Sequence, residues 1–528
     1  MQKSKDRLKN AQHMHYYNKK KDHRWQEGLL HLLVLVLQSS FFETVTCTVT
    51  PPLPVTPFPS GRQLAFQRRE QAMFFHFGIN TFADRETGSG YDDPSIFNPQ
   101  GLDARQWVRE AKNAGFKIVI LTAKHADGFC LWPTAYTDYS VKASPWKNGT
   151  GDVVREVADA AKEQGLEFGL YLSPWDRHEA TYGDTMLYNE FYLAQMRELL
   201  SMYGPISEVF LDGNKGTETR DMVYLFPTWF ALIHQLQPNA NIFSDAGPDV
   251  RWVGDETGEA GVTSWSMINS TAVTIGGAEE AYLNEGDISG LDWVPPECDV
   301  SIRPGWFWHK YQQPRSVETL IDIYFKSVGR NCVMLLNTPP NSTGLLHDTD
   351  VKILQEFKST MESIFSQNLA SKARISASST RGSEATSVEN SPFRPEQVLT
   401  DDLNEYWAAE DGLSSGHLQL DLGANVTFNV VKIQEAVNMG QRVKKYHVDV
   451  WQGASWHTVV HGTTIGYKKL DRITLTSTQL VRFVIDDARA QPLIASFGLY
   501  LDARTKVTCG GSNSTCLSSP TVKTVSVI

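Results

Sequence analysis

The segment "FKIVILTAKH", residues 116–125, is an apolar run that ends in a lysine and a histidine. A strand with one solvated face alternates apolar and polar residues, so an unbroken apolar run predicts a strand buried on both faces of its sheet. Amphipathic helical patterns flank it at residues 103–115 and 151–165, and the second ends on Gly165. A doubly buried strand between two helices predicts an α/β protein with a parallel sheet covered by helices.

The same alternation of strand and helix continues on both sides of this segment. Further strands are predicted at residues 72–82, 166–176, 207–213, 241–247, 264–268, 299–309 and 332–340. With the first segment this gives about eight units, which predicts a (β/α)8 barrel over residues 62–365. A doubly wound open sheet is the alternative, but no G-x-G-x-x-G motif follows the first strand, as a dinucleotide-binding sheet would require.

From residue 368 the pattern changes to short strands separated by turn residues, such as "HLQLDLG", "KYHVDVWQG" and "LVRFVIDD". Strands at this spacing, without helices between them, are typical of a β-sandwich. We therefore expect a second, all-β domain over residues 368–503. The remaining residues, 504–528, are rich in Ser, Thr and Gly, which predicts a polar tail.

The N-terminus carries the features of a targeting segment. Residues 1–25 hold eight Lys or Arg, and an apolar stretch of nine residues follows from Leu29 to Leu37. This stretch is too short to span a bilayer, which takes about 20 residues, but it matches the hydrophobic region of a secretory signal. We expect a signal peptide with an extended basic leader at residues 1–48, with Met14 as an alternative start. The mature protein is then extracellular, apoplastic in a plant, and has no membrane span.

The polar and cysteine residues agree with secretion. Five N-x-[ST] sequons predict a glycoprotein, at Asn148, Asn269, Asn341, Asn425 and Asn513. Cys130, Cys298 and Cys332 lie in apolar contexts and are expected to be packed, whereas Cys509 and Cys516 could close a small loop in the tail. The cysteine and histidine spacing suggests no zinc site, so neither a metal nor a cofactor is expected. A net charge of −11 argues against a nucleic-acid partner.

Polar and aromatic groups follow six of the predicted strands, at the end where barrels place their active sites. They are His76, "KHADG" at residues 124–128, "SPWD" at 173–176, Asp212, "DVRWVGDE" at 249–256 and "RPGWFWH" at 303–309. Flat aromatic rings stack on sugar rings, while histidines and carboxylates bind hydroxyl groups. A metal hydrolase would need more than the one histidine after the first strand. The pattern therefore favours a sugar hydrolase with two carboxyl groups.

Several longer motifs resemble one family. The motifs are "FFHFGINTFADRETGSG", "AKHADGFCLWPTAYTDYSV", "YLSPWDRHE", "VFLDG", "DVRWVGDE" and "SIRPGWFWH". In this order they resemble glycoside hydrolase family 29, the α-L-fucosidases, and within it the secreted plant members that favour α-1,3/1,4-linked fucose. The resemblance implies retaining hydrolysis of fucosylated glycans, with Asp212 as nucleophile and Glu256 as general acid/base. Asp255 and Glu259 are acidic neighbours of Glu256, so the second assignment is the less secure one.

The resemblance also implies a set of sugar contacts and two departures from them. His76, Glu86 and His125 match positions that hydrogen-bond fucose, and Trp175 is a further candidate contact. Ala126 stands where the family usually has a histidine, and Thr87 where it usually has a tryptophan. Because both changes weaken sugar binding, a fucose-binding, lectin-like protein with reduced or lost activity is the alternative.

The second domain has a resemblance of its own. "VLTDDLNEYWAAE" and "LQLDLG" resemble the coagulation factor 5/8 type C, or discoidin, fold, which is close to carbohydrate-binding modules of family 32. Trp407, Trp451 and Trp456 could stack on sugars, although packing is the more frequent role of such residues.

Overall fold

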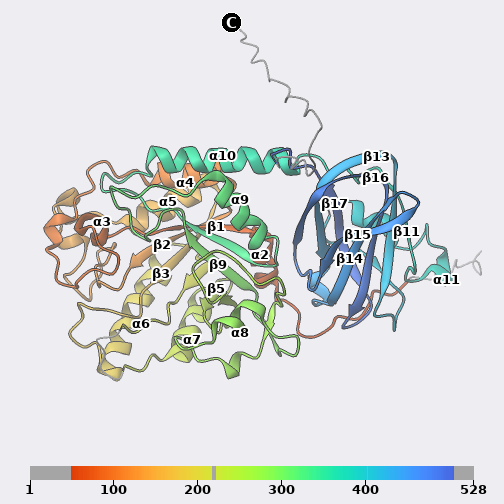
Figure 1. The fold of residues 1–528 in the computed structure, drawn as a ribbon. Coiled ribbons are helices and arrows are strands. Elements are labelled where there is room, and N and C mark those ends of the chain that lie inside the picture. Colours follow the sequence, from red (N-terminus) through yellow and green to blue (C-terminus); the bar gives the residue numbers. More distant parts are fainter. Residues whose placement is uncertain (1–48, 217–221, 401, 505–528) are drawn as a thin grey trace, which may run out of the picture. The chain divides into compact units, whose positions relative to one another are not determined.

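The computed structural model describes residues 49–216, 222–400 and 402–504. Its first part is a closed barrel of eight strands in the order β1-β10-β9-β6-β5-β4-β3-β2, and β1 pairs with both β2 and β10 in parallel. The strands are β1 (Gln71–Phe75), β2 (Ile118–Lys124), β3 (Glu167–Leu172), β4 (Glu208–Phe210), β5 (Asn241–Ser244), β6 (Val250–Trp252), β9 (Pro296–Ser301) and β10 (Val333–Asn337) (Figure 1). The predicted (β/α)8 barrel is confirmed.

Both faces of the barrel wall are buried, which explains the unbroken apolar runs. In β1, Ala72 and Phe74 belong to a cluster inside the barrel, whereas Met73 and Phe75 pack in the larger cluster that includes the surrounding helices. Successive residues of a strand point to opposite faces, so each face takes every second residue. A strand with two apolar neighbourhoods has no position left for a solvated side chain.

Helices surround the barrel (Figure 1). They are α4 (Ala104–Asn113), α5 (Val153–Gln164), α6 (Thr185–Met202), α7 (Phe226–Leu236), α9 (Val317–Lys326) and α10 (Asp348–Phe365), with the shorter α2 (Gly61–Arg69), α3 (Ile79–Ala83) and α8 (Glu280–Glu285). The Asp152 carboxylate caps the start of α5 by accepting from the Arg155 N–H at 2.8 Å. Gly165 ends that helix in the left-handed conformation with φ 72°, as the sequence predicts.

One predicted strand is wrong. Residues 264–268 do not enter the barrel: Met267–Ile268 forms β7 of a separate antiparallel pair with β8 (Asp292–Trp293). The sixth barrel strand is β6, which pairs with β5 and β9. It has three residues, and its centre is the fully buried Arg251, so no apolar run marks it in the sequence. The Arg251 guanidinium is satisfied by three backbone carbonyls, those of Leu283, Val294 and Trp265.

The second part is an antiparallel β-structure, as predicted. Its strands are β11 (Arg374–Ala377), β12 (Trp407–Ala408), β13 (Gly416–Glu435), β14 (Val443–Gln452), β15 (Ser455–Gly462), β16 (Lys469–Ala488) and β17 (Leu493–Tyr500), with the short helix α11 (Ser383–Thr386) before β12. The pairing of β13 with β16 contains register shifts, and such irregularities let long strands bend around a core. Trp407 is fully buried in that core, and its indole donates to the Ser379 carbonyl at 3.0 Å. Its role is packing.

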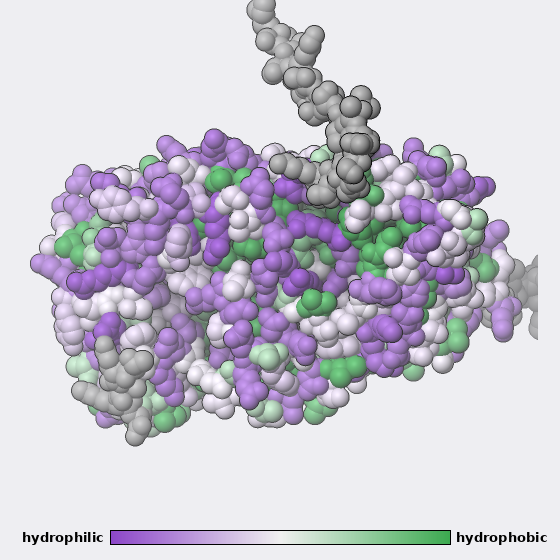
Figure 2. Space-filling model, in the orientation of Figure 1, coloured by the Kyte–Doolittle hydropathy of each residue, from purple (hydrophilic) through white to green (hydrophobic). Residues whose placement is uncertain are grey.

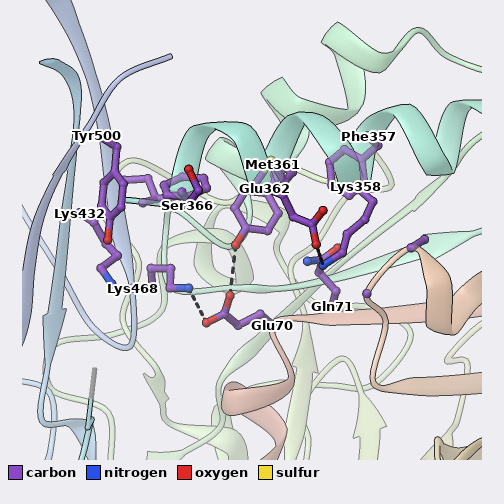
Figure 3. Close-up of a pocket in the computed structure, with 15 residues that line it drawn as sticks. Glu70, Gln71, Phe357, Lys358, Met361, Glu362, Ser366, Lys432, Lys468 and Tyr500 are labelled. Atoms are coloured by element: carbon purple, nitrogen blue, oxygen red, sulfur yellow. Dashed lines mark hydrogen bonds and ion pairs between the residues drawn. The ribbon is translucent and has the colours of Figure 1, made fainter. Parts of the chain in front are cut away.

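The N-terminal end of the barrel contacts the sandwich through Glu70, the residue before β1. Its carboxylate forms an ion pair with Lys468 and accepts from the hydroxyls of Tyr324 at 3.1 Å and Tyr467 at 3.2 Å. A cavity of about 610 Å³ opens here, lined by α10 and by residues of the sandwich. Figure 3 shows Glu70 and Lys468 pointing toward each other in it.

The cysteines differ in part from expectation. Cys298 in β9 and Cys332, just before β10, form a disulfide, so they are bonded to each other as well as packed. Cys130 is a buried free thiol. The predicted signal peptide, Cys509 and Cys516 lie outside the described residues.

Two further observations concern the surface. Figure 2 shows hydrophilic side chains over most of the visible face, with hydrophobic ones in small groups. Among the described helices, none combines the length and the apolar character needed to cross a membrane.

Candidate active site

Two adjoining cavities are lined by residues from the C-terminal ends of the barrel strands and the loops that follow them. The smaller has a volume of about 160 Å³ and the larger about 570 Å³. Asp212 and Glu256 line both cavities. The structure thus brings the two predicted catalytic carboxyl groups together, although 44 residues separate them in the sequence. Five of the six predicted site residues line the smaller cavity: His76, His125, Trp175, Asp212 and Glu256.

Asp212 follows β4 closely and is held by two donors. The Tyr171 hydroxyl donates to its Oδ2 at 3.1 Å, and the Asn214 N–H donates to its Oδ1 at 2.8 Å. Burial raises the pKa of Asp212, and the bonds from Asn214 and Tyr171 offset this only in part. Asp212 therefore has two roles. Its Oδ1 fixes the turn by accepting from the Asn214 N–H, and the residue also lines both cavities.

Glu256 lies in the loop after β6. Its Oε2 accepts from the Trp306 indole N–H at 3.1 Å. Burial raises the pKa of Glu256; the Trp306 bond acts in the opposite direction, and the charges of Asp212, Glu86 and Asp255 add to the rise. A carboxyl group with a raised pKa keeps its proton to higher pH, as a general acid requires.

The two acidic neighbours of Glu256 are engaged elsewhere. Asp255 Oδ1 accepts from the N–H of Thr257 at 2.8 Å and from its hydroxyl at 2.5 Å, which closes a local turn. Glu259 binds Lys326 on α9 at 3.0 Å. Neither lines the two cavities, so the geometry favours Glu256 among the three.

His76 and His125 are neutral imidazoles. His76 Nδ1 lies 2.9 Å from the amide oxygen of Asn337, which can only accept, so Nδ1 carries the proton and Nε2 is left as an acceptor. The Asn337 amide is oriented by its own bonds to Ser301 Oγ at 2.9 Å and the Trp306 carbonyl at 2.7 Å. Burial holds the pKa of His76 well below its usual range, helped by His125, and burial lowers the pKa of His125 to about 4.

Glu86 has a different position from the other predicted contacts. It is not among the residues that line either cavity. Its Oε2 accepts from the backbone N–H groups of Trp306 at 2.9 Å and Phe307 at 3.3 Å, and its Oε1 lies 2.5 Å from His309 Nε2. Glu86 thus fixes the loop after β9, and its direct contact with a sugar stays a prediction.

The two departures noted in the sequence, Thr87 and Ala126, both line the smaller cavity. With the tryptophan and the histidine that the resemblance implies, this cavity would be narrower at these two positions. Trp175 supplies an aromatic face to the same cavity, and the Arg177 guanidinium lies over its ring at 5.5 Å from the centroid.

Sequence reasoning gave no individual role to three residues of the site, although Trp306 belongs to the cluster quoted at residues 303–309. Tyr171 donates to Asp212 from inside β3, and Trp306 donates to Glu256. Asp299 in β9 lines both cavities and accepts from the Trp252 indole at 2.8 Å. Burial, together with the charge of Glu256, holds the pKa of Asp299 well above its usual range. For Tyr171 the signal was a hydroxyl near the end of an otherwise apolar strand, and for Trp306 it was the aromatic cluster at residues 303–309, whereas the mixed composition of β9 gave no such signal for Asp299.

No group of three or more His, Cys, Asp or Glu in the described part of the chain is arranged to hold a metal ion. The smaller cavity brings together the two predicted catalytic carboxyl groups, two imidazoles and several aromatic rings.

Comparisons with known proteins agree on one family. The family model for alpha-L-fucosidase matches residues 67–363, and the model for the F5/8 type C domain matches residues 374–496. Alpha-L-fucosidase 1 of Arabidopsis thaliana is 56% identical over 454 residues, which cover 85% of this chain and 89% of that protein.

Solved structures give the same result. The crystal structure of SpGH29 superposes with a TM-score of 0.81 at 41% identity, covering 85% of this chain and all of that one. A fucosidase of Ruminococcus gnavus, solved in complex with fucose, superposes with a TM-score of 0.80 at 35% identity, covering 86% of this chain and 96% of that one.

Proposed function

The chain belongs to the alpha-L-fucosidase family and is therefore a glycoside hydrolase. From this premise we propose that it is a retaining enzyme that removes α-1,3/1,4-linked L-fucose from oligosaccharides or glycoprotein glycans. The observation that carries the proposal is that Asp212 and Glu256 line the same two cavities. Retaining hydrolysis needs two carboxyl groups close to one glycosidic bond, one as nucleophile and one as acid and base.

In this mechanism Asp212 attacks the anomeric carbon of fucose and forms a covalent glycosyl-enzyme. Glu256 gives its proton to the departing sugar oxygen, and then removes a proton from the water that hydrolyses the intermediate. Tyr171 and the Asn214 N–H hold the Asp212 carboxylate in one orientation. The raised pKa of Glu256 keeps it protonated for the first step.

The two cavities suggest a division of the substrate. We assign fucose to the smaller cavity, where His76 Nε2 accepts from a sugar hydroxyl and Trp175 supplies an aromatic face. The sugar to which fucose is attached then extends into the larger cavity, past Asp212 and Glu256. A branched α-1,3/1,4 linkage presents a second sugar next to fucose, and the larger cavity has room for it.

Secretion is part of the proposal. A disulfide between Cys298 and Cys332 fits a protein that folds in an oxidising compartment. Asn148 and Asn425 are exposed and available to glycosylation. Both features support the signal peptide predicted at residues 1–48.

The test is a panel of fucosides. We expect kcat/KM to be highest for Lewis-type α-1,3/1,4 oligosaccharides, lower for blood-group α-1,2 fucosides, with a synthetic aryl fucoside as reference. Proton NMR of the first-formed product should show α-fucose, which establishes retention. A preference for α-1,2 linkages or a β product would contradict the proposal.

The lectin-like alternative draws on Thr87 and Ala126, which widen the fucose cavity. Membership of the family and the presence of both carboxyl groups in the cavities favour the enzyme. Glycan binding with no release of fucose at any pH from 4 to 7 would support the lectin.

A further inference from the structure

His309, in the loop after β9, is held between two carboxylates from another loop. Its Nδ1 lies 2.5 Å from Asp84 Oδ1, and its Nε2 lies 2.5 Å from Glu86 Oε1. Carboxylates only accept, so both contacts are hydrogen bonds only when the imidazole carries two protons. Burial lowers the pKa of His309, but the bonds and charges of Asp84 and Glu86 outweigh it and raise that pKa above its usual range.

From His309 a continuous path of hydrogen bonds leads to Glu256. Glu86 binds His309 with one oxygen and the backbone N–H of Trp306 with the other, at 2.9 Å. The Trp306 indole then donates to Glu256 at 3.1 Å, and its ring lies 5.0 Å from that of His76. Asp84 and Glu86 follow β1, Trp306 and His309 follow β9, and Glu256 follows β6, so the path joins three loops of the rim.

We propose that His309 is a positioning residue for the general acid/base: as an imidazolium it fixes Glu86, Glu86 holds the backbone of Trp306, and Trp306 orients Glu256 toward the glycosidic oxygen. The inference rests on the proposed role of Glu256. It gives Glu86 a function in catalysis without contact with the sugar.

The charge state of His309 controls the path. A neutral imidazole has one N–H, so it keeps a hydrogen bond to one carboxylate and turns a lone pair toward the other. Two charged groups face His309, Asp84 and Glu86 from the loop after β1. Lys310 is the next residue in the same loop as His309. Glu256, in the loop after β6, is connected to His309 through Trp306. The bridge is therefore complete below the pKa of His309 and is lost as the pH rises through that pKa.

The test compares wild type with His309→Gln, which keeps an amide donor but cannot become a cation. His461→Gln, an exposed histidine of the sandwich, is the matched control. We measure kcat/KM against pH for an α-1,3/1,4-fucosyl oligosaccharide and for an aryl fucoside with a good leaving group. The aryl group departs with little help from an acid. Its kcat/KM therefore depends little on proton donation by Glu256.

We expect His309→Gln to lower kcat/KM for the oligosaccharide by about tenfold at acidic pH and by less than about twofold for the aryl fucoside. For the oligosaccharide, the kcat/KM of wild type divided by that of His309→Gln should fall toward one as the pH rises. At high pH the wild-type His309 also loses its bridge between Asp84 and Glu86. His461→Gln should match wild type on both substrates. A ratio that is the same at all pH values, or an equal loss on both substrates, overturns the proposal and leaves His309 a purely structural role.

Two further variants keep the test decisive. If His309→Gln does not fold, Asp84→Asn takes its place. It weakens the same bridge at Asp84, whose side chain is 70% exposed. The pH profiles of kcat/KM for wild type and His309→Gln should then be replaced by those for wild type and Asp84→Asn, in which the variant loses its bridge at a lower pH. Glu256→Gln tests the premise: if it affects both substrates equally, the proposed function fails. If it affects mainly the oligosaccharide while His309→Gln does not, only the present inference fails.

Discussion

Carboxyl groups at opposite ends of the barrel, Glu70 at one end and Asp212 and Glu256 at the other, have pKa values shifted in opposite directions. At the N-terminal end, burial alone would raise the pKa of Glu70, but the charge and hydrogen bond of Lys468 and the hydroxyls of Tyr324 and Tyr467 bring that pKa below its usual range. At the C-terminal end, burial raises the pKa of Asp212 and of Glu256. Within the described part of the chain, neither of these two forms an ion pair with a lysine or an arginine.

The half-buried Glu70 and Asp212 differ in their partners, since among the described residues only Glu70 is paired with a cation. A buried carboxyl group beside a cation is fixed as an anion and contributes to stability, whereas one with only neutral donors can exchange its proton. Arg69 also binds a buried carboxyl group, Glu208 at 2.8 Å near the start of β4, but there burial raises the pKa and the charge of Arg69 offsets this only in part. Glu70 is thus suited to cohesion with the sandwich, and Asp212 and Glu256 to the proposed proton transfer.

The strongest way to break this contrast is to remove the proposed nucleophile. Asp212→Ala should lower kcat by about 10³-fold or more, because no other group replaces the carboxylate, while the melting temperature changes little. In Asp212→Gly, azide should restore part of the turnover by attacking in its place. Asp138→Ala, at a fully exposed position, is the control. Normal turnover in Asp212→Ala would contradict the assignment.

At the opposite end, Lys468→Met should affect stability and spare catalysis. Removing the cation leaves Glu70 buried without its partner, and we expect the free energy of unfolding to fall by about 2 kcal/mol at neutral pH. Because the pKa of Glu70 is lowered in the folded state, the pair stabilises above the unfolded pKa and its contribution is lost as the pH falls through the folded pKa.

Urea unfolding at pH 7 and at about pH 3 checks this, because the loss should shrink when Glu70 is protonated. The double variant Glu70→Gln/Lys468→Met should be more stable than Lys468→Met alone, since it leaves no buried charge. A change in kcat of Lys468→Met larger than about twofold would mean that the two ends of the barrel are coupled, and would contradict this contrast.

Tyr171→Phe sharpens the comparison from within the active site. Its hydroxyl lowers the pKa of Asp212, so its removal should raise that pKa and move the acidic limb of kcat/KM to higher pH by about one unit. Tyr203→Phe is the control, because it removes a similar hydrogen bond, from Tyr203 to Asp152 at 3.0 Å, away from the cavities. An unchanged acidic limb in Tyr171→Phe would mean that another group controls it.

The smallest expected effect is a gain. Ala126→His adds a polar group to the wall of the fucose cavity and should raise kcat/KM by up to about tenfold through one recovered hydrogen bond. Ala126→Val adds bulk without a donor and should not reproduce the gain, whereas His125→Ala should reduce activity. A loss of kcat/KM in Ala126→His would show that the loop has no room for the imidazole.

The sequence predicts those parts of the molecule whose physical cause is local. Each long barrel strand is an apolar run because both its faces are buried, and Gly165 marks a helix end because it needs a positive φ. Asp212 and Glu256 were identified through motifs, and the structure adds their common cavities. The alternation of strands and helices was sufficient to predict the barrel.

The remaining features depend on contacts between distant segments. β6 carries no local signal because its central residue is Arg251, whose guanidinium donates to carbonyls from elsewhere in the chain. The Cys298–Cys332 bond follows from the neighbouring positions of β9 and β10, which the sequence does not show. The sugar contact of Glu86 stays a prediction, and its hydrogen bonds to Trp306 and Phe307, in a loop more than 200 residues away, could not be read from the sequence.

The pairing of β1 with both β2 and β10 has a consequence for biosynthesis. A ribosome delivers the chain from its N-terminus, so β1 gains its first neighbour early, while its second edge waits for β10, where Gln71 pairs with Met334. An unpaired strand edge can recruit strands of other chains. Glu70, next to that edge, receives Lys468 only when the sandwich has been made. The nascent barrel therefore stays open, and vulnerable to aggregation, until β10 at Val333–Asn337 has left the ribosome.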